Sequence, residues 1–413
     1  MSAEEHAFHI KAYEREPYRR ELATNVVRIG EEDGRPYAVL DDSILYPEGG
    51  GQPADHGRLD DVRVLDVQRR DGEIRHYVDS KTIPAGPVTV ELDWQRRYDH
   101  MQQHTAQHLL TAVADAEYGW ETTSFHLQNE ICDIELATAA IHAGQLGKLE
   151  EAVNAEIRAA RPITARRVSR EEYESLDVRS RGLPEGHSGD VRLVEITDLD
   201  ITTCGGTHLE STAEIETLKL LGTESLRGGT RLFWLAGSRV RHRLARHESR
   251  NAELRQVVGA GDDDLAHVVR QKLSQLKDVT RQTKLLQGRL ADAVAAGLAS
   301  RPGRVVEDHY EGASMDFLQQ IGRRFCASEH PGVALLTAAE DKGHAGLTFV
   351  VAVGGGQDID VQPLGTRVAE ALGGRGGGKG RIYQGKAPLA DGRDEALAAL
   401  AQFSEKEADH ASS

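Results

Sequence analysis

The chain has 413 residues and a formal net charge of −16, from 66 acidic and 50 basic side chains. This length predicts two to four domains, and a hydrophobic content of 39% allows packed cores. The acidic balance argues against general nucleic-acid binding, so a nucleic-acid partner would have to meet local basic clusters. Only 11 of the basic residues are lysine, and many acids with few lysines predict a halophile-like surface.

The chain carries no signal for a membrane or for secretion. No apolar run approaches membrane-spanning length, and residues 1–20 are charged and lack the apolar core of a signal peptide. Cys132, Cys204 and Cys326 are too few and too far apart for a disulfide framework. These features predict a cytoplasmic protein with no membrane partner.

Residues 1–94 are predicted to form a small β-barrel, because short segments alternate apolar and polar side chains between turns rich in Gly and Asp. Within it, the glycines of YPEGGGQPADHG at residues 49–51 require unusual backbone freedom. From Trp94 to Gly119 the apolar spacing becomes helical. A second helix ends before Pro162 and strands such as VRLVEI follow, so residues 95–240 read as an α+β domain.

Residues 241–300 are predicted to form two long helices separated by GAGDDD. A heptad-like seam of residues three and four apart runs along the second helix: Leu276, Val279, Thr283, Leu286 and Leu290. We interpret the seam as internal packing of a helical hairpin linker, with binding of a partner helix as the alternative. Residues 301–413 are predicted to be a small α/β domain with a glycine-rich basic loop at residues 373–386.

Two histidines in HTAQH, His104 and His108, lie four residues apart on a predicted helix. That spacing places both imidazoles on one face, where they can bind one metal ion. A zinc protease of the HExxH type has glutamate after the first histidine, whereas this chain has Thr105, which disfavours peptide hydrolysis. Taken alone, the pair could equally be a surface or capped pair.

The segment TTCGGTHLE places Cys204 and His208 at the same four-residue spacing, with two glycines that would let the chain fold back. A thiolate and three imidazoles form a ligand set that suits Zn²⁺. The alternative is a nucleophilic Cys204 with a histidine base. Four protein ligands are typical of structural zinc, whereas catalytic zinc keeps an open position, and the sequence leaves this point open.

The motifs HTAQHLL and CGGTH resemble the editing domain of alanyl-tRNA synthetase, and still more its free-standing AlaX-type relatives. YPEGGGQPADHG, the segment around CGGTH and GGRGGGKGRIYQG are similar to further family segments, so the resemblance covers nearly the whole chain and its tail marks the long form. It implies a multidomain α+β fold: a β-barrel at 1–94, a zinc editing domain at 95–240, a helical linker at 241–300 and a DHH-associated-like, tRNA-binding α/β domain at 301–413. Because no amino-acid-activating domain precedes the barrel, we expect editing that is independent of ATP.

The resemblance implies zinc-dependent hydrolysis, in trans, of mischarged Ser-tRNA(Ala), with Gly-tRNA(Ala) as a further substrate. A site built for alanine rejects serine poorly, since serine only adds a hydroxyl, so a second, hydrolytic site is needed. The family's metal motifs carry over to His104, His108, Cys204 and His208. The alternative is a non-catalytic tRNA-binding protein with a structural zinc.

The same resemblance places polar residues of WETTSFHLQ opposite the amino acid, so Thr122, Thr123 and Ser124 are candidates to bind the serine hydroxyl. A polar strand edge with only local hydrogen bonds is the alternative. Residues 49–51 either pack against this pocket or form a tight barrel turn. Asp198 or Asp200 would orient a ligand histidine or lie in a solvated turn.

Three basic clusters are candidates for contact with tRNA. They are Arg96 with Arg97; Arg239 with Arg241 and Arg243; and Arg375, Lys379, Arg381 and Lys386. Ordinary surface charge is the preferred interpretation of the first two, and the third resembles the family domain proposed to touch the tRNA elbow. A homodimer through the C-terminal half is the other partner considered.

Overall fold

The computed structural model describes residues 10–128, 130–180, 182–183, 189–339, 346–356, 358–388 and 392–410, with side chains described as far as residue 402. It separates into two compact units, Met1–Glu253 and Leu254–Ser413. Both units combine helices with sheets, which agrees with the predicted multidomain α+β class. The boundaries of the four predicted domains stay predictions.

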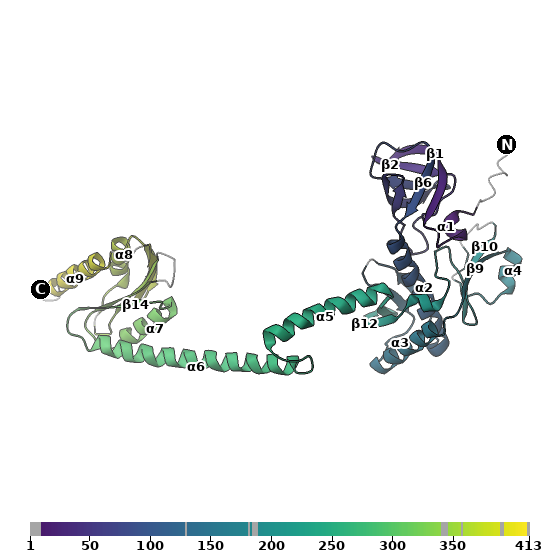
Figure 1. Cartoon of the computed structure of the whole chain (residues 1–413). Coiled ribbons are helices and arrows are strands. Elements are labelled where there is room, and N and C mark those ends of the chain that lie inside the picture. Colours follow the sequence, from purple (N-terminus) through teal and green to yellow (C-terminus); the bar gives the residue numbers. More distant parts are fainter. Residues whose placement is uncertain are drawn as a thin grey trace. The chain divides into compact units, whose positions relative to one another are not determined.

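The first unit begins with the predicted barrel, which six antiparallel strands close in the order β1-β2-β5-β4-β3-β6 (Figure 1). A short helix, α1 (Ala12–Arg15), precedes it. The strands are β1 (Glu21–Glu32), β2 (Arg35–Leu40), β3 (Gly57–Leu59), β4 (Val62–Arg70), β5 (Glu73–Val78) and β6 (Gly86–Leu92). Two hairpins turn at Asp-Gly pairs whose four residues, Asp33, Gly34, Asp71 and Gly72, all have positive φ. This is the conformation that a two-residue turn needs between twisted strands.

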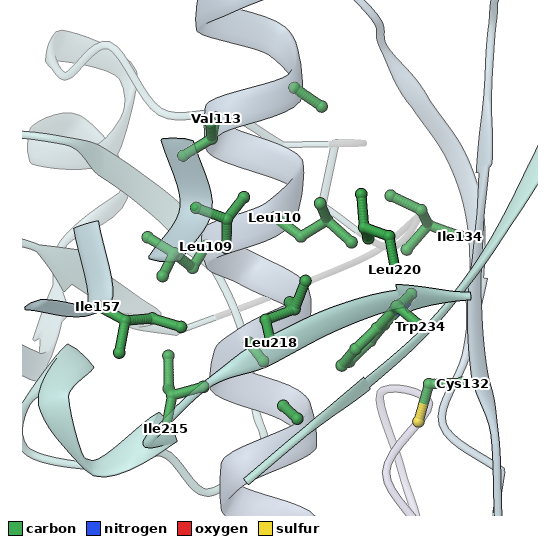
Figure 2. Packing of buried hydrophobic residues seen from close by; sticks show 14 of the residues in the cluster. Leu109, Leu110, Val113, Cys132, Ile134, Ile157, Ile215, Leu218, Leu220 and Trp234 are labelled. Carbon is green, nitrogen blue, oxygen red and sulfur yellow. The ribbon is translucent and has the colours of Figure 1, made fainter. Parts of the chain in front are cut away.

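The helix α2 (Trp94–Tyr118) leaves the barrel directly after β6, as predicted. Asp93 caps its start by accepting a hydrogen bond from the backbone of Arg96, and Gly119 ends it at φ 62°. Apolar side chains on one face of α2 pack into the main core of the unit, where Figure 2 shows Leu109 and Leu110 near strand residues such as Leu220 and Trp234. This packing fixes which way the opposite face of α2 points.

Two antiparallel sheets complete the first unit, with strand orders β12-β13-β8-β7 and β11-β10-β9. The strands are β7 (Thr122–His126), β8 (Cys132–Leu136), β9 (Ile163–Val168), β10 (Val191–Ile196), β11 (Asp200–Thr203), β12 (Leu218–Leu226) and β13 (Gly229–Ala236). The helices between them are α3 (Ala143–Arg158), α4 (Arg170–Ser175) and a 3₁₀ turn (Thr212–Ile215), and α5 (Ser238–Val258) follows β13.

The second unit is a five-stranded sheet in the order β14-β15-β16-β18-β17, with only β14 and β15 parallel. Its strands are β14 (Val305–Glu311), β15 (Val333–Ala339), β16 (Leu347–Val353), β17 (Arg375–Lys379) and β18 (Ile382–Ala387). Its helices are α6 (Leu265–Ala299), α7 (Met315–Cys326), α8 (Val361–Ala371) and α9 (Arg393–His410). One core joins the sheet to α8 and α9, and a second core, on the other side, joins it to α7 and the end of α6.

The glycine-rich segment at residues 373–386 is not the predicted loop, because it forms the hairpin of β17 and β18 at the sheet edge. Close packing requires glycine at some of its positions. A Cβ at Gly376 would overlap the backbone of Gln384 and the ring of Tyr383, and one at Gly385 would overlap Phe349. High glycine content predicts a loop only where no neighbouring side chain demands the space.

The two predicted long helices are confirmed as α5 and α6. The seam on α6 is exposed, from 54% at Leu290 to 63% at Leu276, so the described part of the second unit does not cover it. The division between the units falls within α5, between Glu253 and Leu254, and the packing of α5 and α6 as a hairpin stays a prediction. Among the described residues, no helix is both long and apolar enough to cross a membrane.

Candidate metal centre and its cavity

Four side chains from two distant segments converge on one point: His104, His108, Cys204 and His208. One potential ligand atom from each lies within 4.8 Å of the others. The Cys204 Sγ is 3.4 Å from the His104 Nε2 and 3.3 Å from the His208 Nε2. The helix α2 supplies two histidines, and the loop after β11 returns the other pair to them. The predicted ligand set therefore comes together in space.

Two polar side chains orient these imidazoles from outside. Gln52, in the glycine-rich barrel loop, accepts a hydrogen bond from the His104 Nδ1 at 2.8 Å through its Oε1 atom. The same oxygen accepts one from the backbone N–H of Thr207. The Thr105 hydroxyl lies 3.3 Å from the His208 Nδ1. With its Nδ1 held as a donor, His104 keeps the lone pair of its Nε2 toward the cluster, as metal-binding histidines require.

Burial controls the ionisation of the cluster. It lowers the pKa of His104 to about 3 and the pKa values of His108 and His208 well below the ordinary range, while it raises the pKa of the Cys204 thiol. The imidazoles are therefore neutral at physiological pH, which is the form that binds a metal. The buried Nδ1 of His108 has no hydrogen-bond partner among the described residues. Three neutral imidazoles, a cysteine that would bind a metal as its thiolate, and outer partners on two of the imidazoles together match a zinc-type donor set.

The glycines of CGGTH act differently from the prediction. Neither Gly205 nor Gly206 has a positive φ, so neither serves as a left-handed hinge. A Cβ at Gly206 would overlap the imidazole of His104, whereas one at Gly205 would meet nothing within 4 Å. Gly206 is therefore required because α2, which carries His104, approaches the loop closely.

A cavity of about 480 Å³ opens beside the cluster. His104, His108 and Cys204 border it, and His208 does not. Gly50 and Gly51 from the barrel loop form another part of its lining, and both have positive φ. The loop is thus both a tight turn and a wall of the cavity, which joins the two interpretations of residues 49–51.

Of the three candidates on β7, only Thr122 borders this cavity. Its hydroxyl bonds to that of Thr111 at 3.1 Å, and Thr111 also accepts a hydrogen bond from the Gln107 amide. Thr123 is exposed and bonds instead to the carbonyl of Glu135. Thr123 and Ser124 are thus wrong as cavity residues. A register irregularity between Thr122 and Ser124 breaks the strand alternation that would have placed Ser124 beside Thr122.

Neither aspartate before CGGTH bonds to a ligand histidine. Asp200 holds the guanidinium of Arg179, with the Nε of Arg179 2.9 Å from its Oδ1. Arg179 borders the cavity. Asp198 lies in a turn with φ 58°. Asp200 therefore orients a cation at the cavity edge, which matches neither of its two interpretations, a histidine-orienting carboxylate or a solvated turn.

The first two basic clusters are largely occupied within the protein. Arg97 is fully buried and pairs with Asp55, with its Nε 2.9 Å from the Oδ2, so it is wrong as a tRNA contact. Arg239 pairs with Asp99 and Arg241 with Glu216. Arg96 also donates a hydrogen bond to the carbonyl of Ala54, and Arg97 donates to the carbonyls of Pro17 and Ile44. Their charge serves the packing of α2 and α5.

The third cluster keeps a common face. Arg375 pairs in register with Lys386, and Lys379 lies two alternations further along β17, so all three side chains lie on one side of the hairpin. All three are exposed. Arg381 differs, because its guanidinium donates to the carbonyl of Gly354.

The sequence of this chain resembles those of known proteins. Residues 191–233 match the family model described as the threonyl and alanyl tRNA synthetase second additional domain. The chain is 36% identical to "Alanyl-tRNA editing protein Aarsd1" of Mus musculus over 94% of this chain and 97% of that protein. It is also 36% identical to the Danio rerio protein of the same name, over 89% and 88% of the two chains. The chain belongs to the alanyl-tRNA editing protein family.

Two further likenesses involve the synthetase. The chain is 29% identical to "Alanine--tRNA ligase" of Pyrobaculum neutrophilum, over 89% of this chain and 42% of that protein. A solved structure of the C-Ala domain of Aquifex aeolicus alanyl-tRNA synthetase covers 24% of this chain and 87% of that chain, with 18% identity and a TM-score of 0.22. A TM-score this low carries no conclusion about the fold.

Several residues of this family member that shape the site were not predicted from the sequence. Gln52 and Arg179 reach it only through long-range packing, whereas Gln107 and Thr111 lie on α2, three residues after His104 and His108 respectively. Arg192 is another such residue, since its guanidinium donates to the carbonyls of Cys204 and Gly206. For Gln52, its position directly after three glycines that face the cavity was the one clue available.

Proposed function

We propose that this protein hydrolyses the aminoacyl ester of mischarged tRNA(Ala), chiefly Ser-tRNA(Ala), at a zinc ion held by His104, His108, Cys204 and His208. The observation that carries the proposal is the convergence of four metal-type ligands beside a polar cavity in an alanyl-tRNA editing protein. Bound there, zinc would supply Lewis-acid polarisation of the ester or orientation of the substrate.

The protein's own groups prepare the site for this chemistry. Gln52 holds His104 in the tautomer that leaves its Nε2 available, and the Thr105 hydroxyl contacts the Nδ1 of His208. Arg192 anchors the carbonyls of the loop that carries Cys204. Three ligands facing the cavity, with His208 behind them, support a catalytic role over a purely structural one.

Recognition of serine is proposed to rest on Thr122. Its hydroxyl borders the cavity and belongs to a hydrogen-bonded chain with Thr111 and Gln107. Such a chain can exchange donors and acceptors with an added hydroxyl, which serine has and alanine lacks. Glycine offers no such group, so Gly-tRNA(Ala) would be hydrolysed through binding of the ester and the tRNA alone.

A direct assay tests the function. Purified zinc-loaded protein is incubated with Ser-tRNA(Ala) and with Ala-tRNA(Ala), and release of the amino acid is followed. We expect serine to be released much faster than alanine. Release of serine no faster than in buffer would reject the enzyme and favour the second candidate, a tRNA-binding protein with a structural zinc, which the four-ligand set supports.

The metal assignment has its own test. Cys204→Ala should lower the zinc content and the deacylation rate together, by a factor of about 10³ in rate if the metal polarises the ester. The matched control is Cys326→Ala, a free cysteine of the second unit, which should change neither. Full activity in metal-free protein would refute the zinc site without touching the editing function.

Wider features of the proposal follow from the exposed surface. The shared face of Arg375, Lys379 and Lys386 is proposed to contact tRNA phosphates. The exposed seam of α6 supports a homodimer through the C-terminal half. A cytoplasmic location and an acidic surface adapted to salt complete the proposal, the latter from the net charge of −16.

A further inference from the structure

The helix α6 carries a net positive charge, whereas the whole chain carries a net negative charge. The chain has a net charge of −16, yet α6 holds six basic and only two acidic residues. Three of the chain's 11 lysines lie within it: Lys272, Lys277 and Lys284. Local positive charge against a negative background is the pattern expected of a surface for an anionic partner.

Four of these basic residues form one stripe, which we call the α6 basic stripe: Arg270, Lys277, Arg281 and Lys284. Their spacings of seven, four and three residues place them on one side of a helix. All four are exposed. At a rise of about 1.5 Å per residue the stripe is about 21 Å long, enough to follow several consecutive phosphates.

The stripe is not neutralised by neighbouring carboxylates. Arg281 lies 3.4 Å from Asp278 in an exposed pair. Arg270, Lys277 and Lys284 have no hydrogen bond or ion pair among the described residues. In the first unit, by contrast, exposed arginines such as Arg63 and Arg158 have acidic partners. The positive charge of α6 is thus available to a partner outside the chain.

The apolar residues of α6 occupy a different side of the helix. Leu276, Val279, Leu286 and Leu290 are three, seven and four residues apart, so they share one side of the helix. That side carries none of the stripe residues. The helix contains no Trp, Tyr or Phe, the residues that anchor helices at a membrane surface. A polyanion, which the stripe can bind through charge alone, therefore fits this surface better than a lipid membrane does.

We propose that the α6 basic stripe binds the phosphate backbone of the tRNA substrate outside the cavity, which supplies affinity without reading the amino acid. The inference rests on the proposed function for the identity of the RNA. It is separate from the hairpin of β17 and β18, since the residues belong to different elements. Phosphate contacts of this kind fix position and make binding salt-dependent.

The test replaces the four stripe residues by glutamine in the full-length chain: Arg270→Gln, Lys277→Gln, Arg281→Gln and Lys284→Gln. Binding of uncharged tRNA(Ala) is measured by fluorescence anisotropy across a salt series. We expect at least tenfold weaker binding and a slope of log affinity against log salt that is smaller by about 2 to 4. The KM for Ser-tRNA(Ala) should rise with kcat unchanged, and hydrolysis of 3′-O-seryl-adenosine, which has no tRNA body, should be unchanged.

A matched control changes the same charge elsewhere, in exposed residues that already have acidic partners: Arg35→Gln, Arg63→Gln, Arg158→Gln and Arg170→Gln. The proposal is overturned if this control weakens binding as much as the stripe variant, or if the stripe variant keeps the wild-type salt slope. It is also overturned if the stripe variant loses binding only to phosphatidylserine vesicles. Because binding is measured on uncharged tRNA, absence of deacylation would reject the proposed function without deciding this result.

Discussion

Two basic residues, one from each unit, have opposite surroundings. In the first unit, Arg97 is fully buried, pairs with Asp55 and also bonds to two backbone carbonyls. In the second, the stripe residue Lys277 is exposed and has no partner among the described residues. An enclosed charge must be satisfied within the fold and contributes to its architecture. An exposed charge contributes little to stability and remains available for binding.

The strongest challenge to this contrast is Arg97→Ala. It leaves Asp55 as a buried carboxylate without its cation, which should cost about 3–5 kcal/mol in the free energy of unfolding. The control Arg63→Ala breaks an exposed pair with Asp79 and should cost less than about 1 kcal/mol. Urea unfolding followed by tryptophan fluorescence reports the first unit, since it contains all three tryptophans: Trp94, Trp120 and Trp234. Equal losses in the two variants would contradict the contrast.

The enclosed site can be tested with two adjacent glycines. Gly206→Ala adds a methyl group that overlaps the imidazole of His104, so the ligands should separate and zinc affinity should fall about 10- to 100-fold. Gly205→Ala meets nothing within 4 Å and should keep wild-type affinity. Competition with a chromogenic chelator measures both. If the two variants lost zinc equally, backbone freedom and not close packing would explain the glycine pair.

Burial of a neutral histidine in the barrel should make the fold less stable in acid. Burial lowers the pKa of His76, in the barrel, to about 4. Above pH 6.5 the imidazole is neutral in both states, but as the pH falls toward 4 only the unfolded chain takes up the proton, so stability decreases. From pH 7 to pH 5 this amounts to about 2 kcal/mol. His76→Gln should remove that part of the pH dependence in urea unfolding. An unchanged slope would show that His76 titrates normally.

A neighbouring pair of threonines compares a cavity residue with an external one. Thr122→Val should slow hydrolysis of Ser-tRNA(Ala) about tenfold, the loss of one hydrogen bond, with hydrolysis of Ala-tRNA(Ala) unchanged. Thr123→Val removes a hydroxyl that bonds to the carbonyl of Glu135 outside the cavity and should leave the ratio of the two rates unchanged. A larger change in the ratio of the two rates in Thr123→Val than in Thr122→Val would contradict the assignment of serine recognition to Thr122.

The smallest effect is expected on α6. Lys277→Ala keeps a good helix former and breaks no contact among the described residues. The free energy of unfolding should therefore change by less than about 0.5 kcal/mol, as measured by thermal unfolding followed by circular dichroism. The affinity for tRNA should nevertheless fall. A marked loss of stability would mean that Lys277 is part of the fold and not of a binding surface.

The elements that were predicted well are those with local causes. The start of α2 at Trp94 follows from the Asp93 cap and its end from Gly119, and the barrel hairpins follow from Asp-Gly pairs. The predicted loop at residues 373–386 failed because the need for glycine at Gly376 comes from Tyr383 on the paired strand, and that at Gly385 comes from Phe349 on β16. Composition reports that glycine is present but not which neighbour requires it.

The same division runs through the site. The sequence by itself supplied the four candidate ligands and their pairing, because the two members of each pair lie only four residues apart along the chain. Only the tertiary structure decided that Gln52 orients His104, that Asp200 holds Arg179 and that Thr122, not Thr123, faces the cavity. The physical reason is that these contacts join elements distant along the chain. Their side-chain directions depend on packing and strand register, which no local pattern records.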